Sequence, residues 1–73
     1  MATLIVLDHS GDTRHYFDAR DKKALRDAEF RFKALTDAGY TAAVRNADGE
    51  ASVIRSFDPN AEETLFFPRL VGG

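Results

Sequence analysis

The final apolar run, residues 64–67, restricts the possible folds most, because it offers apolar side chains to both faces of a strand. Pro68 follows it, and proline cannot extend the ladder of a central strand. Residues 69–73 then read Arg-Leu-Val-Gly-Gly, and glycine carries no side chain that would keep it out of a narrow channel. Glycines are also common at chain ends, so Gly72 and Gly73 indicate a function only because they follow an apolar, strand-like run. Together they predict a buried strand that projects a slender tail.

The composition predicts a single small domain. A chain of 73 residues has the length of one domain, and we expect residues 1–68 to form it, with residues 69–73 as a flexible tail. The absence of cysteine excludes a disulfide framework, a thiolate metal site and a cysteine nucleophile. A net charge of −2, with acids spread along the chain, argues against nucleic acid and anionic membranes as partners. No apolar run approaches the length of a membrane span and no signal peptide is evident, so we expect a cytoplasmic protein.

A hairpin and a helix are predicted in the first half of the chain. Residues 3–8 are aliphatic on both faces, and residues 13–17 resume a strand after a turn that contains Gly11. Residues 21–38 predict the only long helix, which Gly39 would end. Its apolar stripe consists of Leu25, Ala28, Phe32 and Leu35.

A second hairpin and a short turn are predicted before the final strand. Asp48-Gly49 lies between residues 40–46 and 50–57, which is a strong hairpin signal. Residues 58–63 predict one helical or 3₁₀ turn, because Asp58 can cap it and proline follows at its first position. The expected order is therefore β-β-α-β-β-(short 3₁₀ turn)-β. This is an α+β fold, with one mixed sheet, one helix across it and the last strand beside the first. That arrangement is the β-grasp.

The tail and the element order together resemble the ubiquitin-like β-grasp family. The tail is similar to the Phe-Phe-Pro-Pro-Val-x-Gly-Gly ending of the small sulfur-carrier subunits of molybdopterin synthase. The matching residues are Phe66, Phe67, Pro68, Gly72 and Gly73. Arg69 stands where the second proline is usual, and an Arg-Leu-x-Gly-Gly ending looks like the tail of ubiquitin. The body looks more like the small ubiquitin-like proteins of bacterial conjugation-type gene sets.

The resemblance implies a chemistry that other proteins carry out on Gly73. An E1-like enzyme would adenylate its carboxylate with ATP, and a thiol would then take the acyl group. An E2-like enzyme, a JAB-type protease and a protein target with an acceptor lysine are the further partners implied. Three functions stay open: a protein modifier, a sulfur carrier with a C-terminal thiocarboxylate, and a β-grasp module that binds or assembles without being conjugated. Arg69 favours the modifier.

Several residues are candidate contacts for partners. In the tail, Arg69 could pair with an acidic groove of the activating enzyme, while Leu70 and Val71 could fill small apolar pockets. On the body, Phe30 lies off the helix stripe, and Phe66 lies opposite its neighbours by strand alternation. Both are candidates for surface contact, although Phe30 could instead be half-covered by neighbouring side chains. The possible self-acceptor lysines are Lys22, Lys23 and Lys33, which otherwise form a solvated helix face.

No arrangement of residues in the sequence predicts catalysis or a bound cofactor. His9 and His15 lie six positions apart, which is not the spacing of a metal-binding pair, so solvated turn and strand residues are the simpler interpretation. Ser10 next to His9 lacks the third member of a catalytic triad. We therefore expect a chain that is not an enzyme, binds no metal or cofactor, and depends on ATP only through its activating partner.

Overall fold

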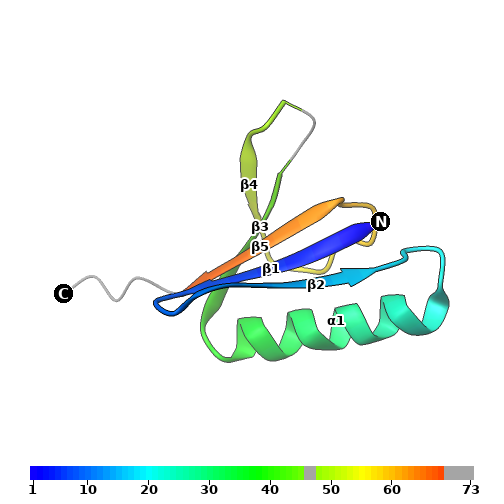
Figure 1. The fold of residues 1–73 in the computed structure, drawn as a ribbon, viewed down its shortest axis with the longest axis horizontal. Helices are drawn as coiled ribbons and strands as arrows, with labels where there is room; N and C mark the ends of the chain where they lie inside the picture. Colours follow the sequence, from blue (N-terminus) through cyan, green and yellow to red (C-terminus); the bar gives the residue numbers. More distant parts are fainter. Residues whose placement is uncertain (46–47, 69–73) are drawn as a thin grey trace.

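A computed structural model describes residues 1–45 and 48–68 of the chain. It shows an α+β fold in which one helix packs against one face of a mixed five-stranded sheet (Figure 1). The elements are β1 (Ala2–Asp8), β2 (Gly11–Phe17), α1 (Lys22–Asp37), β3 (Tyr40–Arg45), β4 (Ala51–Ile54) and β5 (Glu63–Pro68). The predicted fold class, with one mixed sheet and one helix, is confirmed.

The strand β5 occupies the centre of the sheet, whose order is β2-β1-β5-β3-β4. It runs parallel to β1, with Leu65 opposite Ile5, and antiparallel to β3, with Leu65 opposite Ala43. A central strand buries both faces, which explains why residues 65–67 are all apolar and why Thr64, which is 2% exposed, is buried with them. The prediction that the last strand lies beside the first is confirmed.

The helix α1 begins and ends close to the predicted positions because its caps are encoded locally. The Asp21 side chain accepts hydrogen bonds from the backbone N–H groups of Lys23, at 3.0 Å, and Ala24, at 3.4 Å. After the last turn, Gly39 adopts a φ of 103°, a conformation that L side chains rarely adopt. Two residues of the apolar stripe, Ala28 and Phe32, are buried against the sheet.

Phenylalanine rings from four segments of the chain form the core between α1 and the sheet. The ring of Phe32 lies 5.6 Å from that of Phe66 and 5.9 Å from that of Phe57, both edge-on. The ring of Phe57 also lies 6.3 Å from that of Phe17. The two edge-to-face pairs of Phe32 stabilise the core by about 0.5–1.5 kcal/mol each beyond the burial of their area.

The segment between β4 and β5 differs from the prediction. Strand β4 ends at Ile54, and Phe57 packs into the core instead of continuing the strand predicted over residues 50–57. Residues 58–61 form a turn and not a 3₁₀ helix. The side chain of Asp58 accepts a hydrogen bond from the N–H of Asn60 at 2.9 Å, and its carbonyl accepts one from Ala61 at 3.3 Å. Asp58 therefore caps a tight turn that returns the chain to β5.

The described residues contain no helix that is both long and apolar enough to cross a membrane.

Candidate interaction surface

The alternation of side chains along β5 decides which aromatic residues can meet a partner. Phe66 points toward α1 and is 0% exposed, so the prediction that it lies on the surface is wrong. Phe67 points to the opposite face and is 36% exposed. The sequence predicts that neighbouring residues of a strand face opposite ways, but not which set the helix covers.

The outer face of the sheet, which α1 leaves uncovered, carries an apolar patch. In register across the sheet, Ile5 of β1 lies opposite Leu65 of β5, Leu65 opposite Ala43 of β3, and Ala43 opposite Val53 of β4. Side chains two positions along a strand share its face. The outer-face patch therefore consists of Ile5, Leu7, Ala43, Val53, Leu65 and Phe67.

The accessible part of the outer-face patch lies around its rim. Ile5 and Ala43 are buried among their neighbours, whereas Leu7, like Phe67, is 36% exposed and Val53 is 67% exposed. Leu7 and Phe67 follow the register pair Val6 and Phe66 and so lie side by side, whereas Val53 lies apart from them on the edge strand β4. Large apolar side chains exposed together on one face, as Leu7 and Phe67 are, are the usual anchors of a protein contact. The patch can bind an apolar partner surface, but it carries no group that could react.

An ion pair borders the outer-face patch on β2. The Nε atom of Arg14 donates a hydrogen bond to Oδ2 of Asp12 at 3.2 Å, and both side chains are about half exposed. This hydrogen bond to Asp12, together with Tyr16, raises the pKa of Arg14 above its ordinary value. In the register of the hairpin Arg14 lies opposite Ile5 and Asp12 lies opposite Leu7, so a pair of opposite charges flanks the apolar surface.

The predicted tail contacts, Arg69, Leu70 and Val71, and the predicted activation residues, Gly72 and Gly73, lie outside the described residues. The last described residue is Pro68, which lies opposite Tyr40 of β3. Figure 1 shows that β5 ends at the same side of the sheet as the β1–β2 turn.

The helix carries the other predicted contact residues on its solvent side. Phe30 is 76% exposed, so it is not half-covered by its neighbours. It borders a shallow cleft of about 330 Å³ with Asp27, Arg31 and Ala34. The three lysines of the helix, Lys22, Lys23 and Lys33, are exposed as well.

The two histidines lie apart. His9 is exposed in the β1–β2 turn, whereas His15 lies opposite Leu4 within β2, four strand residues or about 13 Å beyond Gly11. Partial burial, and secondarily the positive charge of Arg31, lower the pKa of His15. Among the described residues, no group of three or more His, Cys, Asp or Glu side chains could hold a metal ion.

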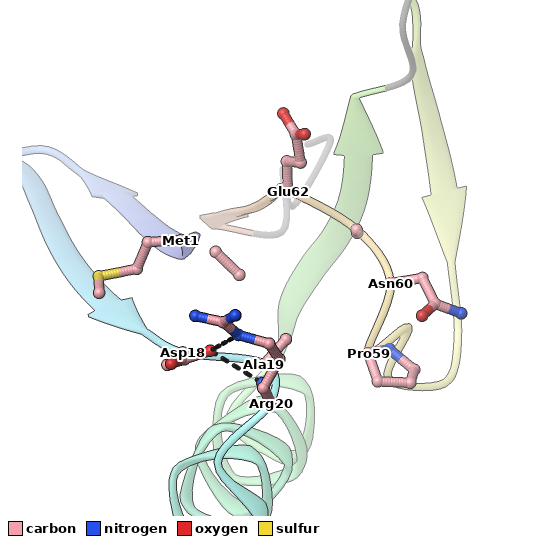
Figure 2. A pocket seen from close by; sticks show the side chains of 9 residues that line it. Met1, Asp18, Ala19, Arg20, Pro59, Asn60 and Glu62 are labelled. Atoms are coloured by element: carbon pink, nitrogen blue, oxygen red, sulfur yellow. Dashed lines mark hydrogen bonds and ion pairs between the residues drawn. The ribbon is translucent and has the colours of Figure 1, made fainter.

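The hollow shown in Figure 2 lies at the end of the sheet where β1 begins, and its volume is about 360 Å³. The Asp18 carboxylate accepts hydrogen bonds there from the backbone N–H of Arg20 at 2.9 Å and from its Nε atom at 3.3 Å. The bond to the backbone N–H and the bond to the Arg20 side chain lower the pKa of Asp18. Figure 2 shows the Glu62 side chain directed away from this pair. The feature that this hollow holds is thus a surface ion pair between Asp18 and Arg20.

Sequence reasoning missed the contributions of Leu7 and Val53 to the surface. The signal that could have found Leu7 is its spacing of two from Ile5 in a strand that is apolar on both faces. No family model, no curated protein and no solved structure matches this chain. The candidate surface therefore rests on the placement of its residues.

Proposed function

We propose that the chain is a ubiquitin-like protein modifier with a β-grasp fold, activated at the carboxylate of Gly73. The observation that carries the proposal is the place of β5. This strand lies between β1 and β3, contributes Leu65 and Phe67 to the outer-face patch, and leads directly into the Arg-Leu-Val-Gly-Gly sequence. A partner that holds the patch would have the tail within reach.

The sheet topology supports the β-grasp assignment. One hairpin precedes the helix and a second follows it, and the first and last strands run parallel side by side at the centre. The strands β2 and β3 run parallel to each other on either side of this central pair, and α1 crosses one face of the sheet to connect them. The same topology leaves the other face of the sheet open.

The proposed chemistry has three steps, all catalysed by partners. The carboxylate of Gly73 attacks the α-phosphorus of ATP, which forms an acyl-adenylate and releases pyrophosphate. A thiolate of the activating enzyme then attacks the glycyl carbonyl and displaces AMP, which leaves a thioester. Finally, the amine of a target lysine displaces the thiol, and an amide bond forms. A glycine carbonyl suits the second and third steps, in which it is attacked, because it is the least hindered carbonyl that a chain can offer.

The body and the tail have separate roles in this proposal. The outer-face patch, with Leu7 and Phe67 at its rim, docks on the activating enzyme through apolar contact. Arg69 pairs with an acidic groove of that enzyme, and the following Leu70 and Val71 occupy small pockets on the way to its nucleotide.

Pyrophosphate exchange with an E1-like enzyme from the same organism tests the proposal. The intact chain should support ATP-dependent exchange, whereas deletion of Gly73 or addition of one residue after it should abolish exchange. Phe67→Ser should raise the concentration needed for half-maximal exchange, while Phe30→Ser, which makes the same change on the helix, should not. A chain with a blocked C-terminus that supports full function would contradict the proposal and favour a module that binds without conjugation.

A sulfur carrier is the second candidate, because Phe66-Phe67-Pro68 matches the tail of the molybdopterin synthase subunits. In that reaction, sulfide attacks the acyl-adenylate, AMP leaves, and the chain ends in a thiocarboxylate. Both candidates need Gly73 and release pyrophosphate, so exchange does not separate them. Intact mass does, because the sulfur carrier replaces one oxygen of the free chain by sulfur, whereas the modifier becomes linked to a second protein.

A further inference from the structure

The strand β2 forms a long and regular edge of the sheet. Within residues 1–45 and 48–68 its only partner is β1, and it is seven residues long, whereas the edge strand β4 has four. Its register with β1 contains no bulge, and its sequence contains neither proline nor lysine. Short length, bulges, proline and charged side chains, lysine above all, keep edge strands apart, and of these devices β2 has only the charges of Asp12 and Arg14. Alternate backbone N–H and C=O groups of β2 therefore remain available for another strand.

The charges on β2 are complementary to those of a second β2 in antiparallel orientation. Asp12 and Arg14 lie two positions apart, project from the same face and are both exposed. A twofold axis at Thr13 places Asp12 of each copy directly opposite Arg14 of the other. If the axis moves by one residue, either Asp12 faces Asp12 or Arg14 faces Arg14, and like charges directly opposite destabilise a strand pair.

The helix side of β2 also accommodates a second copy. With the axis at Thr13, Gly11 faces His15 of the other copy, and glycine adds no side chain to the partly buried histidine. Because the axis runs perpendicular to the sheet, both helices lie on the same face. The flank of α1 beside β2 carries Asp27 and Arg31, which line a groove of about 430 Å³ with His15. One acid and one base on each flank give the two helices no excess of like charge.

We propose that two copies of the chain pair through β2, antiparallel about an axis at Thr13, and so join their sheets into one. Only residues 11–15 of each copy pair, so the interface is small and the dimer is weak. The pairing uses the edge of the sheet and leaves both β5 and the outer-face patch free. The proposal is independent of the activation of Gly73, since molecular mass alone tests it.

Sedimentation equilibrium of the purified chain, at concentrations up to about 1 mM, measures the dimer. Asp12→Arg and Arg14→Asp should each weaken it by about tenfold, because each substitution places two like-charge pairs across the axis. The double exchange Asp12→Arg with Arg14→Asp should restore the dimer. Asp37→Arg and Arg26→Asp are matched controls, which make the same charge changes at exposed positions of α1 and should leave the dimer unchanged.

Single-cysteine variants test the position of the axis, because the chain has no cysteine of its own. Residues directly opposite have Cβ atoms about 4.5–5.5 Å apart, close to the reach of a disulfide. In a glutathione redox buffer, Thr13→Cys should form covalent dimers faster than Tyr16→Cys on the same strand or Ser52→Cys on β4. A chain that stays monomeric at about 1 mM would overturn the proposal. A dimer that tolerates Asp12→Arg, or equal cross-linking of the three cysteine variants, would overturn it as well.

Discussion

Two phenylalanines that the sequence offers as candidate surface contacts, Phe66 and Phe30, occupy opposite environments in the fold. Phe66 is enclosed beneath α1, where its ring meets that of Phe32 at 5.6 Å. Phe30 projects from the solvent side of the same helix and meets only a shallow cleft. The free energy of unfolding should depend strongly on the first ring and hardly on the second.

Phe66→Ala should therefore lower the free energy of unfolding by about 3–5 kcal/mol, because it leaves a cavity in the core. That loss is comparable to the whole stability of a domain of this size, so Phe66→Leu provides a milder change to measure beside it. Phe30→Ala is the matched control and should change the value by less than about 0.5 kcal/mol. Urea denaturation, monitored by circular dichroism, gives these free energies of unfolding. An equal loss of stability in Phe30→Ala and Phe66→Ala would refute the placement of Phe66 in the core and Phe30 on the surface.

At the scale of the elements, Asp21 is the residue on which the start of α1 depends. Asp21→Ala removes acceptors for the N–H groups of Lys23 and Ala24 and should lower stability by about 1 kcal/mol. Asp37→Ala removes an acid from the last turn of the same helix, where a negative charge is unfavourable, and should be neutral or slightly stabilising. The two variants are compared by thermal unfolding. An equal loss of stability in both would argue against a capping role for Asp21.

The limits of sequence-based prediction follow from how local each signal is. The helix was predictable to within a residue at each end, because Asp21 and Gly39 act on the backbone beside them. The end of β4 was not, because Phe57 leaves the strand to join rings that come from distant segments. For the candidate surface, strand alternation separated Phe66 from Phe67 but did not tell which of them α1 would cover.

At the scale of the whole molecule, three titratable groups predict how stability falls with pH. The lowered pKa of His15 means that the unfolded chain binds its proton more readily, so stability should first decrease as the pH falls through the ordinary histidine value of about 6.5. Hydrogen bonds from Ser10 lower the pKa of Asp8, as those from Arg20 lower that of Asp18. Their contribution is present above about pH 4 and should decrease below it.

Urea midpoints measured from pH 8 to pH 3 would therefore fall in two steps, both modest because these groups are partly exposed and solvent screens their interactions. His15→Gln should remove the step near neutral pH and keep the acidic one. Asp8→Asn combined with Asp18→Asn should have the reverse effect. A single acidic step that His15→Gln leaves unchanged would contradict the assignment of the first step to His15.

Trypsin digestion would leave a recognisable remnant of the tail on any protein to which the chain is attached. Trypsin cleaves after Arg69, so a lysine joined to Gly73 would retain Leu-Val-Gly-Gly as a branch after digestion. A sulfur carrier or a non-conjugated module would leave no such branch on any other protein. This remnant therefore distinguishes a modifier from a sulfur carrier and from a non-conjugated module.

Tryptic peptide mass spectrometry of cells that produce the chain tests the proposed modification most directly. The proposed modification should yield lysine-containing peptides that carry Leu-Val-Gly-Gly, present with the intact chain and absent when Gly73 is deleted. It would be contradicted by branched peptides that persist after the deletion. It would be contradicted equally if cells that make the intact chain yield no branched peptide while the chain is recovered only in free form.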